Sequence, residues 1–355
     1  MERRQTRKIA VGELFMGGGE RILIQSMTNA PAHDRENTLS QIKALERAGC
    51  DVVRFTVPDM ETVRNIAYYK ENSSVALVAD IHFDHRLAVE SVAAGIDKVR
   101  INPGNIGSAD KVKKVALACL ERKVPIRIGV NSGSVEKRLL EKYQGPTAEA
   151  LAQSGIEQAQ ILEGFGFSDI VISVKSSSVA TMIKANRLLA QKTDYPLHLG
   201  VTEAGGKEMG TVKSAVGIGS LLIDGIGDTV RVSLTDDVTQ EVDAAKKILL
   251  ACGLQEGGID LVSCPTCGRT KIDLISIVKQ MENKLAELKL SPKKTVKAAV
   301  MGCAVNGPGE AREADVGIAG GDGYALLFKK GQIIEKIPED KIVEVLTSEI
   351  VKLCE

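Results

Sequence analysis

Three cysteines in the last third of the chain have the type and spacing that bind metal clusters. Cys264 and Cys267 form a Cys-x-x-Cys pair, which places two thiolates on one turn. Cys303 follows within residues 301–310, a glycine-rich segment whose backbone N–H groups could hydrogen-bond to cluster sulfides. Structural zinc favours four Cys or His ligands, whereas these segments supply three thiolates and one carboxylate, Glu310. The set therefore indicates an iron–sulfur cluster, with Glu310 as the candidate for the remaining ligand.

The number of thiolates also bears on what such a cluster does. A cluster with three thiolates and a replaceable fourth ligand can bind substrate directly, whereas one with four thiolates only passes electrons. A zinc ribbon and a redox dithiol are the alternatives for the Cys-x-x-Cys pair, although no thioredoxin-like pattern surrounds it. We interpret the other cysteines as buried or incidental thiols, namely Cys50, Cys119, Cys252 and Cys354.

A second group of residues has the chemistry to bind phosphate. Five cationic side chains lie in or directly after short β-branched runs: Arg54, Arg100, Arg127, Lys175 and Arg231. Guanidinium groups match phosphate oxygens two bonds at a time, so this density favours a substrate with more than one phosphate group. Neither a P-loop nor a Rossmann fingerprint is present, which disfavours nucleoside triphosphates and NAD.

Three further residues could transfer protons at the same place. His82, His198 and Glu203 each lie in or just beyond a predicted strand. A lone histidine near a strand end is more often a structural hydrogen-bonding group than an acid or base, and both interpretations stay open for these two.

The elements that must position these residues repeat as strand–helix units. Eight short runs rich in β-branched residues alternate with helical patterns between residues 21 and 250, at the spacing of βα units. The predicted strands are residues 22–25, 52–56, 76–80, 98–101, 125–130, 170–174, 196–201 and 229–232. In a closed barrel the carboxyl ends of all eight strands meet at one mouth, where the polar residues above would converge. We therefore predict a (β/α)8 TIM-like barrel, with a doubly wound open sheet as the rival architecture.

A glycine-rich stretch before Cys264 marks a domain boundary. We predict the barrel over residues 1–255 as the diphosphate-binding domain, and a small α+β iron–sulfur domain over residues 256–355. Short strands are expected at 297–301, 315–319, 324–329 and 332–336, followed by a terminal helix from residue 339. Residues 16–20, with three glycines, are expected to turn a hairpin at the barrel floor.

Composition limits the partners and the location. The chain has 46 basic and 46 acidic residues, no tryptophan and few other aromatics, which argues against a nucleic-acid partner. No apolar run reaches the roughly 20 residues of a membrane helix, and no secretory signal is apparent. Seven cysteines do not make a disulfide framework. We therefore predict a cytoplasmic protein that does not act at a membrane.

The motifs resemble those of the bacterial 4-hydroxy-3-methylbut-2-enyl diphosphate synthase family, from the methylerythritol phosphate route to isoprenoids. The resemblance covers nearly the whole chain, and the two cysteine motifs are highly specific in combination. The matching segments are QSMTN (25–29), VR (53–54), ADIHF (79–83), RINPGN (100–105), RIGVN (127–131), LGVTEAG (199–205), CPTCGR (264–269) and GCAVNGPGE (302–310).

The resemblance implies an oxidoreductase that reduces 2-C-methyl-D-erythritol 2,4-cyclodiphosphate by two electrons, opening the ring and losing water. It implies a 4Fe-4S cluster on Cys264, Cys267, Cys303 and Glu310. We expect Glu310, Glu203 and His82 to be the catalytic residues. It also implies flavodoxin or ferredoxin as electron donor, and a homodimer in which the active site is shared between subunits. The substrate-binding residues that it implies are Arg54, Arg100, Arg127, Asn131, Lys175, His198, Thr202, Arg231 and Ser233.

Three other classes remain as alternatives from the residues alone. A radical barrel that uses S-adenosylmethionine would need a Cys-x-x-x-Cys-x-x-Cys motif, which is missing. An aldolase or phosphatase barrel with a zinc-stabilised tail comes next. A zinc-ribbon module that binds nucleic acid or protein is the candidate from outside the enzymes, and the neutral charge counts against it.

Overall fold

The computed structural model describes residues 2–255, 257–288, 290, 292–304 and 311–355. The chain divides into two compact units, one that ends at Leu254 and one that begins at Gln255. We call them the barrel unit and the C-terminal unit. No helix within the described ranges is long and apolar enough to cross a membrane.

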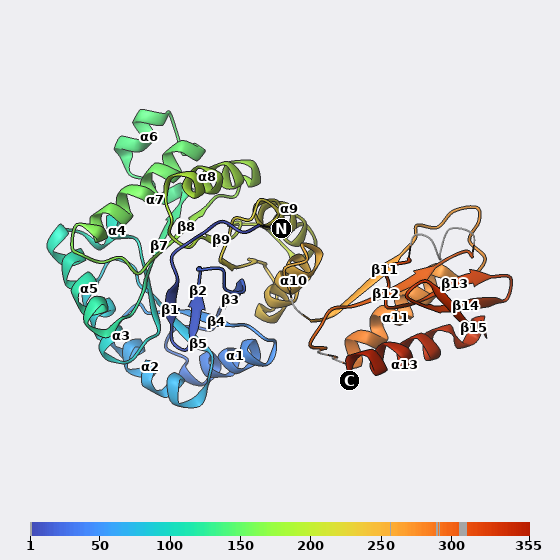
Figure 1. The fold of residues 1–355 in the computed structure, drawn as a ribbon. Helices are drawn as coiled ribbons and strands as arrows, with labels where there is room; N and C mark the ends of the chain where they lie inside the picture. The colour runs from blue at the N-terminus through green and yellow to red at the C-terminus, as the bar shows by residue number, and fades with distance from the viewer. Residues whose placement is uncertain (1, 256, 289, 291, 305–310) are drawn as a thin grey trace. The chain divides into compact units, whose positions relative to one another are not determined.

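Eight parallel strands form the wall of the barrel unit. Their order is β8-β7-β6-β5-β4-β3-β10-β9, and a parallel bridge from Ile172 to Leu197 links the β8 end to the segment leading into β9. The ring is therefore nearly closed (Figure 1), and the predicted TIM-like barrel is confirmed. The strands are β3 Leu23–Met27, β4 Val52–Thr56, β5 Ala76–Asp80, β6 Lys98–Ile101, β7 Ile126–Asn131, β8 Ile170–Lys175, β9 His198–Leu199 and β10 Thr229–Val230.

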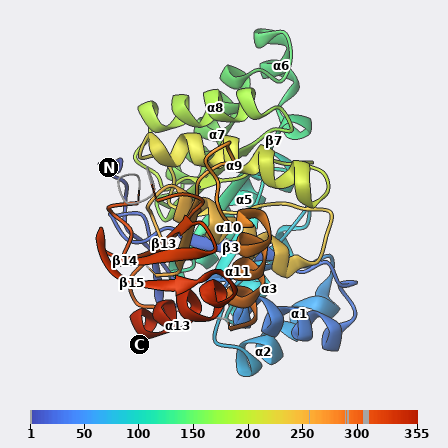
Figure 2. The ribbon, with the colours of Figure 1, turned by 90° about the vertical axis from the view of Figure 1, so that its right-hand side faces the viewer.

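Helices surround these strands on the outside (Figures 1 and 2). Many begin at a side chain that caps the first turn; Asp34 accepts a hydrogen bond from the Asn37 amide, and Asp59 does the same for Thr62. The helices are α1 Arg35–Arg47, α2 Met60–Asn72, α3 His85–Ala93, α4 Pro103–Ile106, α5 Ala109–Arg122, α6 Lys137–Tyr143, α7 Ala148–Glu163, α8 Val179–Lys192, α9 Lys207–Ile223 and α10 Val238–Ala251.

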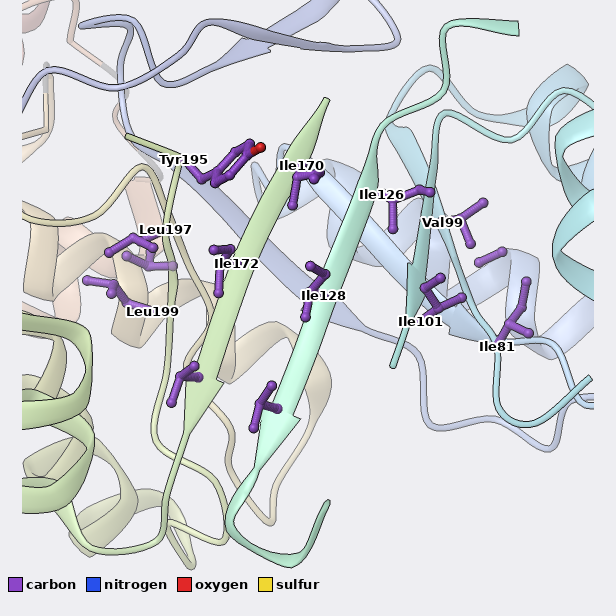
Figure 3. Packing of buried hydrophobic residues seen from close by; sticks show 14 of the residues in the cluster. Ile81, Val99, Ile101, Ile126, Ile128, Ile170, Ile172, Tyr195, Leu197 and Leu199 are labelled. Atoms are coloured by element: carbon purple, nitrogen blue, oxygen red, sulfur yellow. The ribbon is translucent and has the colours of Figure 1, made fainter. Parts of the chain in front are cut away.

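Alternation along each strand divides the side chains between two environments. Ile126 and Ile128 of β7 pack with Ile170 and Ile172 of β8 in the main hydrophobic core, which faces the helices (Figure 3). Because successive side chains of a strand point to opposite faces, Arg127 between the two isoleucines must point into the barrel. The same alternation directs Arg54, Asp80 and Arg100 of the neighbouring strands inward.

An N-terminal hairpin closes the floor of the barrel. Strands β1 (Ile9–Val11) and β2 (Leu14–Met16) pair antiparallel and turn at residues 12–13. They pack against inward-facing apolar residues of the barrel strands in one cluster, which contains Ile9, Val11, Met16, Leu23, Val52, Ala76, Val78 and Val171. The expected hairpin turn at residues 16–20 is wrong. Gly17, Gly18 and Gly19 have positive φ and instead connect β2 to the first barrel strand.

The C-terminal unit is an α+β fold on one mixed sheet (Figure 1). Strands β11, β12 and β13 run parallel, and β14 and β15 continue antiparallel. Apolar residues of helices α11 and α13 cover one face of this sheet. The elements are β11 Ile259–Ser263, α11 Leu274–Leu288, β12 Val296–Met301, β13 Val316–Gly321, β14 Tyr324–Lys329, β15 Gln332–Pro338 and α13 Ile342–Cys354. The predicted α+β class is confirmed, although the sequence pattern did not indicate β11.

The outward core of the barrel can be tested at Phe55. Its ring packs edge to face against Tyr69 of α2, with ring centroids 5.3 Å apart. We expect Phe55→Ala to lower the free energy of unfolding of the barrel unit by about 3–5 kcal/mol in urea titrations, because it leaves a cavity. The control Phe15→Ala, at a ring 46% exposed on the hairpin, should cost under about 1 kcal/mol. Equal losses would contradict this assignment of the core.

Candidate functional site

The carboxyl ends of the barrel strands surround a polar cavity of about 170 Å³. Strands β4 to β8 contribute inward side chains there, and the segments that follow β5, β9 and β10 supply the rest. Its lining consists of Arg54, Asp80, His82, Arg100, Arg127, Gly129, Asn131, Ser173, Lys175, Thr202, Arg231 and Ser233. Nine of the predicted site residues therefore line one cavity: His82, Arg54, Arg100, Arg127, Asn131, Lys175, Thr202, Arg231 and Ser233.

Two of the predicted residues lie elsewhere in the barrel, and one lies outside the described residues. His198 is fully buried, and its Nδ1 lies 2.6 Å from the hydroxyl of Thr229. Glu203 is exposed and has a φ of 54°, a strained value for a residue other than glycine. Neither lines the cavity. Glu310 belongs to residues 305–310, which the structure does not describe.

Asp80 organises one side of the cavity. Its carboxylate accepts a hydrogen bond of 3.0 Å from Arg100 Nη1 and lies 3.7 Å from Arg54 Nε. The same Arg100 nitrogen is 3.0 Å from His82 Nε2. Although burial opposes ionisation, Arg54, the hydrogen bond with His82 and Arg100 hold the pKa of Asp80 below its ordinary value. Asp80 is therefore ionised and fixes the positions of Arg54 and Arg100.

Glu241 fixes the position of Arg231, as Asp80 does for Arg54 and Arg100. The sequence analysis did not identify this residue. This buried carboxylate on α10 lies 3.2 Å from Arg231 Nη2 and also accepts hydrogen bonds from the Ser26 hydroxyl and the Leu234 amide. Glu241 lies inside a helix pattern, so its spacing gave no sign of a site. A buried carboxylate needs such partners, which makes burial the signal that could identify it.

Two cations in the cavity, Arg127 and Lys175, form no ion pair with any carboxylate of the described residues. In the part of the chain that the structure describes, none of the three guanidinium nitrogens of Arg127 has a hydrogen-bond partner. Burial lowers the pKa of both Arg127 and Lys175, and neighbouring cations lower each further. Leaving a buried charge unpaired is costly, so these cations suit an anion that would complete their hydrogen bonds.

Glycine makes room for one of these cations. A Cβ atom on Gly129 would lie 2.5 Å from Arg100 Nε and 2.7 Å from its Nη2. The absence of a side chain on this inward position of β7 lets the Arg100 guanidinium lie across the strand. Gly129 is thus a positioning residue, which the sequence analysis included only within the matching segment 127–131.

The predicted cluster cysteines lie at one edge of the C-terminal sheet. Cys264 directly follows β11, and Cys303 comes two residues after the neighbouring parallel strand β12. The Gly302 amide donates a hydrogen bond of 3.2 Å to Cys264 Sγ. Cys267 is exposed, and hydrogen bonds from Arg269 lower the pKa of its thiol.

These donors suit an iron–sulfur cluster in chemistry, although they are not gathered as a finished site. Thiolates are the ligands that iron–sulfur clusters use, and backbone amides such as that of Gly302 stabilise their sulfur atoms. Among the described residues, no three His, Cys, Asp or Glu side chains lie close enough together to hold a metal ion.

Family models match both units of the chain. The GcpE TIM-barrel domain matches residues 6–246, and the GcpE protein C-terminal domain matches residues 260–352.

Characterised relatives match over the full length. The chain is 55% identical to 4-hydroxy-3-methylbut-2-en-1-yl diphosphate synthase (flavodoxin) of Clostridium perfringens, over 100% of this chain and 99% of the relative. The protein of the same name from Ruminiclostridium cellulolyticum is 55% identical, over 99% of this chain and 98% of the relative. A dihydropteroate synthase from Yersinia pestis shares only the barrel fold, with 11% identity and a TM-score of 0.50 over 70% of this chain and 100% of its own.

The role of Gly129 gives a test of the cavity. We expect Gly129→Ala to displace the Arg100 guanidinium and weaken pyrophosphate binding about tenfold, measured by calorimetry. The fold should persist because the atoms that must move belong to the end of a flexible side chain. Gly133→Ala is the matched control, since nothing lies within 4 Å of its added Cβ. Equal affinities of the two variants would contradict the positioning role.

Proposed function

The chain belongs to the GcpE family, and from this membership we propose which residues bind the substrate, hold the cofactor and transfer protons in the family reaction. The protein is an oxidoreductase that converts 2-C-methyl-D-erythritol 2,4-cyclodiphosphate to 4-hydroxy-3-methylbut-2-enyl diphosphate. Two electrons enter, the ring opens at a C–O bond, and one oxygen leaves as water. The observation that carries this proposal is the cationic cavity, in which Arg127 has no hydrogen-bond partner among the described residues.

The barrel unit binds the substrate in this proposal. A cyclic diphosphate supplies the negative charge and the acceptor oxygens that Arg127 and Lys175 lack. Arg54 and Arg100, held by Asp80, and Arg231, held by Glu241, are oriented before the substrate arrives. Fixed cations of this kind stabilise charge without reorganisation during the reaction. Asn131, Thr202 and Ser233 provide neutral hydrogen-bonding groups beside them, with His198 buried beneath.

The C-terminal unit holds the cofactor in this proposal. Cys264, Cys267 and Cys303 bind a 4Fe-4S cluster, with Glu310 as the replaceable fourth ligand. When bound, such a cluster supplies the two electrons one at a time to the C–O bond. The hydrogen bond from the Gly302 amide to Cys264 Sγ is of the type that stabilises a cluster thiolate.

Loss of water requires a proton on the departing oxygen. We assign proton transfer to His82, which lines the cavity next to Asp80 and Arg100, and to Glu203 just after β9. Glu310 completes the catalytic set as a carboxylate at the cofactor. An exposed Glu203 can exchange protons with solvent, whereas His82 can deliver one inside the cavity.

Three further parts of the proposal concern the surroundings of the chain. The names of the relatives specify flavodoxin, so a flavodoxin, or else a ferredoxin, is the proposed electron donor. We propose a homodimer with an active site shared between subunits, located in the cytoplasm. The direct test is an anaerobic assay of the full chain with the cyclic diphosphate and a strong one-electron reductant. Absence of the allylic diphosphate product from cluster-loaded protein would refute the proposed function.

Arg127 allows binding and stability to be separated. We expect Arg127→Met to lower kcat/KM by about a hundredfold or more, because an unpaired donor to the substrate is lost. The same change should raise the thermal midpoint by about 2–4 °C, because it removes an uncompensated buried charge. The exposed Arg64→Met on α2 should change neither quantity. A loss of activity that accompanies a lower thermal midpoint would point to misfolding instead.

The cluster ligands can be tested by iron content. We expect anaerobically reconstituted Cys303→Ser to lose most of its iron and sulfide and its absorbance near about 400 nm, because too few thiolates remain. Cys354→Ser, near the chain end, is the matched control and should retain both. Zinc bound to colourless wild-type protein would instead favour a structural zinc site.

A further inference from the structure

Lys98 is a buried cation that the site described above does not use. It lies on β6, two residues before Arg100, and Val99 between them packs in the core that faces the helices. Alternation therefore directs both Lys98 and Arg100 into the barrel, with Lys98 one layer deeper. The side chain is 0% exposed and does not line the cavity.

Among the described residues, the hydrogen-bond partners of the Lys98 nitrogen are uncharged groups. Nζ lies 3.4 Å from Gln25 Oε1 and 3.6 Å from Met16 Sδ. Met16 belongs to the apolar floor that the N-terminal hairpin completes, and it is itself 0% exposed. No carboxylate within the described ranges forms an ion pair with Lys98. An ammonium group at this place would thus be desolvated and uncompensated.

The charges that face Lys98 from neighbouring strands make protonation more costly. Burial lowers its pKa most, and Arg127 on β7 and Arg54 on β4 lower the pKa further. His198 on β9 faces the same group of cations. Asp97 opposes the shift, but its carboxylate is already engaged by Lys70 and by the Leu77 amide.

We infer that Lys98 is an uncharged amine while the cavity is empty, and that it takes up a proton from solvent when a diphosphate binds above it. This inference rests on the proposed function, because it needs an anion in the cavity. The guanidinium groups cannot release their protons, whereas a buried lysine can. An anion paired with Arg127 and Arg54 removes the repulsion that these residues exert on Lys98, so the protonated form of Lys98 becomes more stable than the neutral amine. Lys98 is thus a positioning residue that adjusts the interior charge to the ligand.

Proton uptake has a measurable consequence for affinity. Uptake of about one proton makes affinity fall by about tenfold for each pH unit in the range where the free protein has lost that proton. An ordinary lysine stays protonated at about pH 8 and takes up nothing there. Lys175 is the other buried lysine, but it lines the cavity and would meet the anion directly. The experiment must therefore identify the nitrogen that changes.

The test is nitrogen NMR of the full chain labelled with ¹⁵N-lysine at about pH 8, where free lysine is charged. Lys98→Met identifies the Lys98 resonance by its disappearance, and Lys98→Arg does so if the first variant fails to fold. We expect an amine resonance in the free protein and an ammonium resonance after addition of pyrophosphate. Calorimetry in two buffers of different ionisation enthalpy should show about one proton less taken up by Lys98→Met than by wild type. The exposed Lys113→Met on α5 is the matched control and should match wild type.

The outcomes separate this inference from the proposed function. A Lys98 nitrogen that is charged in both states, or neutral in both, while pyrophosphate binds, would overturn the inference and leave the diphosphate site intact. Failure of pyrophosphate to bind the wild-type protein would overturn the anion site and the inference together. A change of charge at Lys175 alone would also refute the role of Lys98.

Discussion

The arrangement of the barrel unit depends on desolvated positive charge that the protein itself does not neutralise. Five cations line the cavity and Lys98 lies below them, whereas Asp80 lines it and Glu241 lies behind Arg231. The two carboxylates orient Arg54, Arg100 and Arg231, whereas Arg127 has no hydrogen-bond partner in the described part of the chain. Unpaired buried charge destabilises a fold, so the rest of the barrel must supply the stability that this interior removes. A ligand that carries two phosphates resolves the imbalance.

Successive side chains of a strand point to opposite faces, and this alternation allows the buried charges and a stable apolar core to form on the same strands. On β6, β7 and β8 every outward side chain is apolar and belongs to one cluster, while the inward positions hold Lys98, Arg100, Arg127 and Lys175. The interior also changes along the barrel axis. The floor, with Met16 and Val78, is apolar, and the mouth is cationic. The hairpin therefore has a chemical role as well as a structural one, because it keeps the low-dielectric environment intact beneath the cations.

The sequence predicted the features that follow from periodicity. It did not predict the features that depend on contacts between distant elements. Strand ends such as Arg54 and Arg127 were identified because a parallel barrel brings all carboxyl ends to one mouth. Glu241 was missed because its partners, Ser26 and Arg231, come from distant elements and leave no local pattern. His198 was expected to line the cavity with the others, but it pairs in register with Thr229, which pairs in turn with Leu23 of the apolar floor. Its ring therefore lies below the cavity, against the Thr229 hydroxyl. The three glycines of residues 17–19 were interpreted as the hairpin turn. Their positive φ values instead shape the connection from β2 to β3, which follows the hairpin.

In both units, the carboxyl ends of parallel strands bring together functional residues that are distant in the sequence. In the barrel it gathers cations from β4, β6, β7, β8 and the end of β10. In the C-terminal sheet the pairing of Ser263 with Val300 on β11 and β12 brings Cys264 beside Gly302, which precedes Cys303. The sequence pattern did not indicate β11, yet without this strand the Cys-x-x-Cys turn would have no fixed place relative to Cys303. A parallel pair fixes which ends meet but leaves the following loops free to be shaped by their ligand. This explains why residues 264–267 and 302–303 meet at the carboxyl end of one sheet: the pairing of β11 with β12 supplies their proximity.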